Sequence, residues 1–246
     1  MTAVTRSGLL AGILHPESDT ARGVRRAMVR LVIVCALIPA ALFISAGRLD
    51  WDMAWVYTAF MFALQAIALR ILLPEHADLV AERSRLQPGT KSWDKVLAPV
   101  IAILAPIGTY VVAGLDFRFH WSPPVALWAS LISFAALVAG YGLVLWAMTV
   151  NRFFASTVRI QSERGHRVIQ DGPYRHVRHP GYAGTSLFLA ATPLALGSLW
   201  GLVPAGLGLC LLVLRTVLED RTLQRELAGY RDYAARVRWR LLPGLW

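Results

Sequence analysis

Long runs of apolar residues constrain this 246-residue chain more than any other feature of its sequence. A helix needs about 20 mostly apolar residues to cross the roughly 30 Å hydrocarbon core of a bilayer. Runs close to or above this length occupy residues 28–46, 51–73, 96–115, 125–150 and 181–218. Charged residues make up only 16% of the chain, against about 25% in soluble domains. The sequence therefore predicts an all-α, polytopic membrane helix bundle.

The last apolar run is too long for a single crossing. Gly197-Ser198, near its middle, is typical of a tight turn. We therefore predict a C-terminal helical hairpin with arms at 183–196 and 199–218. The first arm is short for a full span, so the bundle is predicted to have five to six transmembrane segments.

Basic residues alternate between rich and poor connections along the chain. The rich stretches are the arm 1–27, the loop 74–95, the segment 151–180 and the tail that follows the hairpin, whereas the other two loops hold only Arg48 and Arg118. The positive-inside rule places the rich side, with both termini, in the cytoplasm. Membrane lipids are therefore expected partners. The net charge of +10 does not indicate nucleic-acid binding, because the basic residues lie between apolar runs.

Polar and aromatic residues gather just before the hairpin, in residues 170–184. Gly172-Pro173 is a turn signal, and Pro180 suits the first turn of a helix. A helix start near Arg175 and Arg178 is suited to an anion, although these arginines would also suit lipid phosphates. The hairpin returns the tail to the same membrane face, so the segment and the tail are predicted to wall one cytoplasmic pocket.

Two further pairs of residues could carry chemistry. His176 and His179 are three residues apart, but no cysteine or carboxylate nearby completes a metal site, so no metal is predicted. Arg215 and Glu219 are four residues apart and lie on one helix face. Ionisable residues at membrane depth are usually functional, and a simple ion pair between the two is the alternative.

The run from Gly172 to Gly184, with Arg215-Thr-Val-Leu-Glu219 downstream, resembles the signature of the isoprenylcysteine carboxyl methyltransferase family. This family is related to the integral membrane phospholipid N-methyltransferases, and the likeness continues through the tail to Trp246. The resemblance implies an S-adenosylmethionine-dependent methyltransferase with a lipophilic or lipidated acceptor. Together with the apolar runs and the basic residues, it divides the chain into a cytoplasmic arm (1–27), four transmembrane helices (28–150) and a methyltransferase-like catalytic region (151–246).

The resemblance also implies roles for particular residues. Arg215 is implied to be a catalytic residue that contacts the methyl acceptor. Cofactor contacts are implied for Gln161, His166, Arg167, Val168, Ile169, Tyr174, His179, Pro180, Gly181, Tyr182 and Glu219. The chain departs from the family pattern at Asp220, where a second Glu is common, and at Leu227-Ala-Gly229, where an aromatic residue precedes the glycine.

The acceptor group stays open at this stage. A carboxylate such as that of isoprenylcysteine is ionised at pH 7 and needs no general base, and Arg215 is suited to orient it. A thiol or a lipid amine would have to lose a proton, and Tyr174, His179 or Glu219 would then assist.

Two other functions compete with methyl transfer. Integral membrane sterol reductases, which bind NADPH, have a similar C-terminal region, and the ending Arg238–Pro243 is close to theirs. They tend to have Asn where this chain has Gly181, and Pro180 fits the methyltransferases better. The third reading is a non-enzymatic lipid-binding protein, because a fold does not determine a function; such a protein would bind neither cofactor. The oligomeric state is not predicted.

Overall fold

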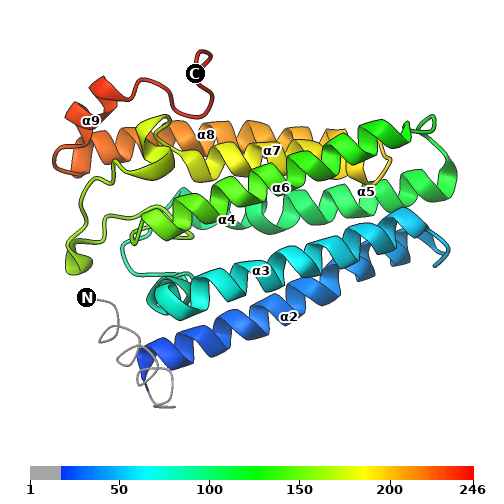
Figure 1. Ribbon diagram of the computed structural model, residues 1–246, viewed down its shortest axis with the longest axis horizontal. Helices are drawn as coiled ribbons and strands as arrows, with labels where there is room; N and C mark the ends of the chain where they lie inside the picture. The colour runs from blue at the N-terminus through cyan, green and yellow to red at the C-terminus, as the bar shows by residue number, and fades with distance from the viewer. Residues whose placement is uncertain (1–17) are drawn as a thin grey trace.

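The computed structural model describes residues 18–246, and they form a bundle of long helices (Figure 1). The helices are α2 (Asp19–Ala46), α3 (Asp52–Glu82), α4 (Asp94–Pro99), a π-helical turn (Val100–Leu104), α5 (Ala105–Phe119), α6 (Leu127–Val150), α7 (Pro180–Ala195), α8 (Leu202–Glu226) and α9 (Tyr230–Arg236). Within residues 18–246, five stretches are long and apolar enough to cross a membrane, namely α2, α3, α4 through α5, α6 and α8. The predicted all-α, multi-pass membrane bundle is confirmed.

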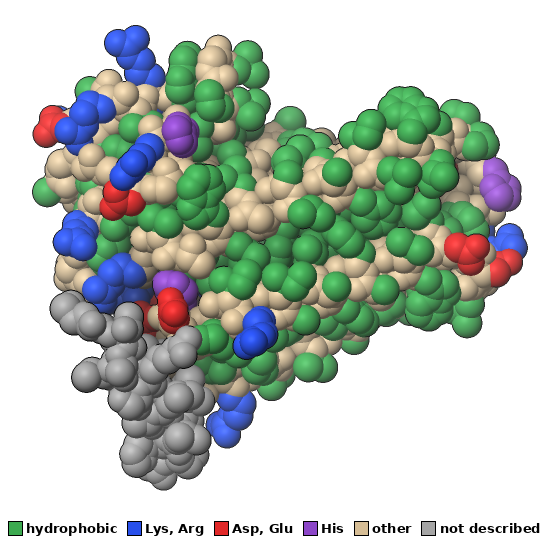
Figure 2. Space-filling model, viewed as in Figure 1, with side chains coloured by type: hydrophobic (Ala, Val, Ile, Leu, Met, Phe, Trp, Pro, Cys, Tyr) green, Lys and Arg blue, Asp and Glu red, His purple; other side chains and the backbone are tan. Residues whose placement is uncertain are grey.

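The surface of the bundle is divided into an apolar middle and polar ends. Large apolar side chains point outward along the helices, among them Val32, Ile44, Ile67, Leu131 and Val203. Figure 2 shows them as a broad band across the middle, with most of the visible Lys and Arg at the end that carries α9. An exposed apolar surface of this extent requires a lipid environment.

The predicted hairpin is present as α7 and α8. The chain reverses at Gly197, whose φ of 76° is a left-handed conformation that glycine adopts readily. Its first arm, α7, has 16 residues and therefore rises only about 24 Å. It falls short of a full crossing, as its predicted length indicated.

Helix α2 begins earlier than predicted. Ser18 caps it by accepting a hydrogen bond from the amide of Ala21 at 3.1 Å, and Asp19 lies in its first turn. Residues 19–27, expected to belong to a cytoplasmic arm, are therefore helical. The rest of that predicted arm, residues 1–17, lies outside the described residues.

Helices α3 and α8 also run further than predicted. α3 continues past Pro74, with a kink at His76, and ends at Glu82. The loop predicted to begin at residue 74 therefore begins at Arg83. Its last turns remain helical because Ala77 and Leu79 are buried against the bundle, and membrane helices tolerate an internal proline. α8 extends from the expected end at residue 218 to Glu226. Both extensions carry charged residues out of the apolar layer.

Helices α6 and α7 pack with their backbones in close approach. A Cβ atom on Gly140 would lie 2.6 Å from the carbonyl oxygen of Gly184, and one on Gly184 would lie 2.4 Å from that of Gly140. Any larger residue at either position would separate the helices. Small residues at such crossings are the usual means of close helix packing in membranes. This contact fixes the first turns of α7 against the middle of α6.

Candidate active site

One cavity lies at the polar end of the bundle, where α6 ends and α8 leaves the apolar layer. It holds about 1330 Å³ of space, its open mouth included. Its walls come from the segment 151–179, from α7 and α8, from Tyr230 and Tyr233 of α9, from Arg83 after α3, and from the π-helical turn. Ligand sites in bundles commonly occupy such positions between helices.

The structure brings the predicted site residues together in this cavity, with one exception. Residues Gln161, His166, Arg167, Val168, Ile169, Tyr174, His179, Gly181, Tyr182, Arg215 and Glu219 all line it. Pro180 does not line it, because it is buried as the first residue of α7, where its missing N–H costs nothing. Gly181 follows, and a Cβ there would lie 2.5 Å from the ring of Phe154.

A buried carboxylate, Asp220, organises the signature segment. Its oxygens lie 2.9 Å from Nε of Arg178 and 3.3 Å from Nε2 of His179. The hydroxyl of Tyr230 donates a hydrogen bond to Asp220 at 3.1 Å, and Nε of Arg240 lies 3.1 Å from the other oxygen of the same carboxylate. Asp220 has an exposed side-chain fraction of only 1%. Asp220 therefore supplies a carboxylate where a second Glu is common in the family pattern. This carboxylate connects the signature to α8 and to the tail.

The tail is attached to the signature by backbone hydrogen bonds as well. The amides of Arg178 and His179 donate to the carbonyls of Trp239 and Arg240 at 2.9 and 3.0 Å. The guanidinium of Arg178 donates to the carbonyls of Ala234, Val237 and Arg238. Arg178 is therefore a structural residue that holds the tail over the cavity, and it is not a contact for lipid phosphate as one reading of the sequence had it.

Arg215 is paired with a residue that sequence reasoning missed. Nε and NH2 of Arg215 donate to the two carboxylate oxygens of Asp94 at 2.7 and 2.9 Å. Asp94 also accepts the amide hydrogen of Val158 at 2.6 Å and is fully buried. The alternative of an Arg215–Glu219 ion pair is wrong, since Glu219 instead accepts a hydrogen bond from the hydroxyl of Tyr182. Nothing in the local sequence around Asp94 signals this pairing.

Aromatic rings form much of the wall around these charges. The ring of Tyr182 stacks on His179 with a centroid separation of 5.7 Å, and the guanidinium of Arg215 lies 5.1 Å from the Tyr182 centroid. Tyr174 accepts a hydrogen bond from Asn151 at 3.0 Å, and burial raises the pKa of its phenol above the ordinary value. The walls thus offer ring faces to a cation and to apolar groups.

His166 is held in its neutral form. Its Nδ1 accepts the amide hydrogen of Gln161 at 3.3 Å. Burial, with the positive charges of Arg159 and Arg164, lowers the pKa of His166 to about 4. The side chain of Gln161 is itself buried and donates to the carbonyl of Phe153 at 2.7 Å. These contacts shape the turn that presents residues 166–169 to the cavity.

His166 should make the stability of the fold depend on pH between 6.5 and about 4. Because its folded-state pKa lies below the ordinary 6.5, the stability it contributes is present above pH 6.5 and is lost as the pH falls towards 4. We expect the melting temperature of the wild type to fall more steeply over this window than that of His166→Asn, whose amide oxygen can still accept the Gln161 hydrogen. A matched substitution at exposed His176 should keep the wild-type slope. Equal slopes for the wild type and His166→Asn would contradict the assignment.

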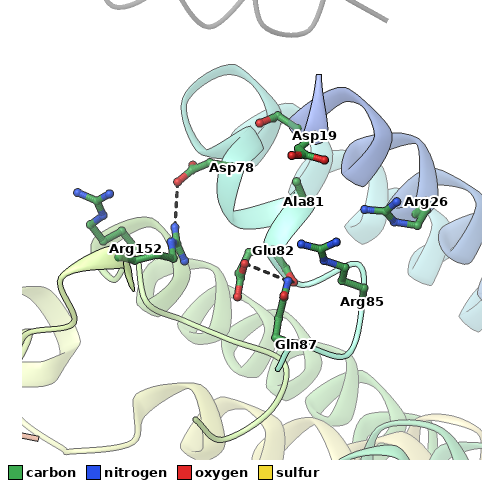
Figure 3. A pocket seen from close by; sticks show the side chains of 10 residues that line it. Asp19, Arg26, Asp78, Ala81, Glu82, Arg85, Gln87 and Arg152 are labelled. Carbon is green, nitrogen blue, oxygen red and sulfur yellow. Dashed lines mark hydrogen bonds and ion pairs between the residues drawn. The ribbon is translucent and has the colours of Figure 1, made fainter. Parts of the chain in front are cut away.

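A second, smaller cavity lies between α2 and the end of α3 (Figure 3). It holds about 630 Å³, its mouth included, and is lined mostly by charged side chains. Arg164 pairs with Asp78 at 3.1 Å, and Gln87 donates to Glu82 at 3.0 Å. Glu82 also pairs with Arg159, which lines the first cavity, at 2.5 Å. These internal pairs make the second cavity a polar contact region between helices, and none of the predicted site residues lies in it.

Comparison with known proteins finds a family match over part of the chain, which includes most of the residues that line the larger cavity. Residues 131–225 match the model of the isoprenylcysteine carboxyl methyltransferase (ICMT) family. The resemblance to that family is confirmed over these residues. The matched ICMT region runs from α6 through the signature and α7 to the end of α8. It starts earlier than residue 151 and ends before α9, so the likeness seen in the tail lies outside it.

Two curated rice proteins also resemble part of the chain. Each is described as a probable protein-S-isoprenylcysteine O-methyltransferase, one from Oryza sativa subsp. indica and one from subsp. japonica. Each is 30% identical to this chain over 95 residues, which is 38% of this chain and 50% of the relative. The chain thus spans about half the length of these relatives.

Proposed function

We propose that this protein is an integral membrane methyltransferase that uses S-adenosylmethionine to methylate the carboxylate of an isoprenylcysteine. The observation that carries this proposal is the convergence of the ICMT region on one cavity. The signature, α7 and α8 are joined there by Asp220, and the predicted cofactor and acceptor residues other than Pro180 line the same space. The two rice relatives, named as O-methyltransferases of isoprenylcysteine, support the choice of acceptor.

The cavity residues suit S-adenosylmethionine. The carboxylate of Glu219 lines the cavity and, among the described residues, has no ion-pair partner, so its charge is available to a cationic group. We propose that Glu219, Tyr174, Gln161 and the segment 166–169 hold the cofactor, with His179, Gly181 and Tyr182 shaping the same wall. The bound cofactor would supply an electrophilic methyl group on a positively charged sulfur.

The residues around the acceptor would act by binding and desolvation. An ionised carboxylate needs no base, so no side chain has to move a proton. Five of the described residues that line the cavity are arginines, and three of these pair with carboxylates outside the lining. Arg83 and Arg167 remain, against the single acidic lining residue Glu219. This excess of positive charge favours an anionic acceptor over a lipid amine. Arg215, held by Asp94 and Ser156, presents its remaining N–H groups at a fixed position, which limits the motion of a bound acceptor.

The lipid part of the substrate would enter from the side of the bundle. The apolar end of the cavity is lined by Ile101, Ala102 and Leu212, which belong to helices of the apolar layer. We propose that the polar end faces the cytoplasm, in agreement with the distribution of basic residues. The cofactor would then arrive from water and the isoprenyl chain from lipid.

Glu219→Gln should weaken cofactor binding while leaving the fold intact, because the amide keeps an acceptor for Tyr182 but loses the charge. We expect the dissociation constant for S-adenosylmethionine, measured by calorimetry in detergent, to rise about 10- to 100-fold. Glu226→Gln, a change on the same helix whose carboxylate pairs outside the cavity with Lys91, should bind as the wild type does. Unchanged affinity in Glu219→Gln would remove Glu219 from the cofactor site.

The same titration of the wild type tests the function itself. Saturable binding of S-adenosylmethionine but not of NADPH, followed by methyl transfer to an S-prenylated cysteine, is the expected result. Binding of NADPH alone would favour a sterol-type reductase. Binding of neither cofactor by folded protein would favour a non-enzymatic lipid-binding role.

A further inference from the structure

Arg83, the residue after α3, places a cation in the wall of the cavity. Its guanidinium carbon lies 5.0 Å from the centroid of the Phe154 ring, and NH1 donates to the Phe154 carbonyl at 3.3 Å. The residue is partly accessible, and it lines the cavity. It lies in the half of the chain that the ICMT match does not cover. From the sequence it counted only as one of the basic residues that set the membrane orientation.

The fully buried arginines that line the cavity all have carboxylate partners. Arg215 pairs with Asp94 at 2.7 Å, Arg178 with Asp220 at 2.9 Å, and Arg159 with Glu82 at 2.5 Å. Arg83 has no carboxylate within 4.0 Å anywhere in residues 18–246. Its Phe154 contacts compensate only part of the charge.

The surroundings of Arg83 penalise its charge. Burial lowers the pKa of Arg83 to about 10, and the positive charge of Arg215 adds to the effect. The guanidinium nevertheless stays protonated at pH 7. A charge withdrawn from water is normally paired. Arg83 is half-buried and has no carboxylate partner in residues 18–246, so we expect it to bind an anion from outside these residues. The cavity that Arg83 lines is the space from which such an anion would reach it.

We propose that Arg83 binds the carboxylate of the methyl acceptor. This inference rests on the proposed function, and it adds a substrate-binding residue from the N-terminal half of the chain. Arg83 and Arg215 line the same cavity, and their positive charges repel each other, so a carboxylate bound in that cavity would relieve the repulsion. Methylation turns the carboxylate into a neutral ester, which no longer pairs with Arg83. Binding is thereby favoured for the substrate, and release is favoured for the product.

The test compares an acid with its neutral analogue. The ligands are an N-acylated S-prenylcysteine and the primary carboxamide of the same molecule, used as a competitive inhibitor of the wild type, Arg83→Gln and Arg83→Lys. We expect the wild type to prefer the acid over the amide by about 10- to 100-fold. Arg83→Gln should lose this preference, with a raised KM for the acid, and Arg83→Lys should keep part of it. The affinity for S-adenosylmethionine should not change.

Arg85→Gln provides the matched control. Arg85 is exposed, lies two residues further along and lines only the second cavity (Figure 3), so its variant should keep the full preference for the acid. Arg83→Gln should fold with an unchanged or higher melting temperature, since it removes a charge that has no carboxylate partner. If Arg83→Gln does not fold, Arg83→Lys with a reduced preference still supports the inference, and Arg83→Lys with the full preference overturns it.

The outcomes separate this inference from the proposed function. Full retention of the acid preference in Arg83→Gln, with an active wild type, overturns the role of Arg83 alone. So does a loss of S-adenosylmethionine affinity with the preference intact, which would assign Arg83 to the carboxylate of the cofactor. A folded wild type that transfers no methyl group overturns both.

Discussion

Asp220→Asn should destabilise the protein by about 3–5 kcal/mol, because it removes the charge that compensates a buried arginine. The substitution keeps the shape of the side chain. It leaves the Arg178 guanidinium, 6% exposed, without an anion, and it weakens the contacts of His179 and Arg240 with the same carboxylate. The structural consequence should be loss of the attachment between the signature and the tail.

Two measurements check this result. Equilibrium unfolding in mixed micelles should show the loss of stability, and limited proteolysis should show faster cleavage in the tail after α9. Asp232→Asn, on the exposed face of α9, should match the wild type in both. An Asp220→Asn protein with the wild-type unfolding midpoint and an uncut tail would show that the carboxylate does not hold the tail.

Asp94→Asn should have a comparable cost, about 3–5 kcal/mol. The Arg215 guanidinium would keep its position in the wall but lose the bidentate anion that neutralises it. Asp94 also holds the amide of Val158, so the segment before the signature should loosen as well. Asp50→Asn, in a solvent-exposed pair with Arg48, should leave the unfolding free energy nearly unchanged.

A double substitution distinguishes a missing charge from a missing shape. Asp94→Asn combined with Arg215→Met removes both charges of the buried pair, keeps an acceptor for the amide of Val158 and should recover most of the lost stability. If the double variant is as unstable as Asp94→Asn alone, the cost does not come from an uncompensated charge.

The same argument applies to Arg215→Ala, which leaves the carboxylate of Asp94 buried and unpaired. A loss of turnover in that variant would therefore mix an effect on the fold with any effect on the acceptor.

The boundaries of the helices show how far hydropathy can be trusted. Apolar length predicted the membrane helices and the turn at Gly197, because the bilayer requires a minimum length and a satisfied backbone. It failed where helices leave the apolar layer. α3 continues past Pro74 to Glu82, and α8 continues through Asp220 and Thr222 to Glu226. In these turns the helix is kept by packing and by ion pairs, which a hydropathy pattern does not record.

The sequence by itself determined the class of the protein, the hairpin, the end of the bundle that is rich in basic residues, and a set of residues that would share a site. These features depend on local composition, on short motifs and on resemblance. Only the tertiary structure decided how the charges are partnered. Arg215 meets Asp94 across 121 positions, Arg178 meets Asp220 across 42, and Arg83 meets no carboxylate in the described residues. The reason is physical, since ion pairing depends on distances of a few ångströms that only the packed helices establish.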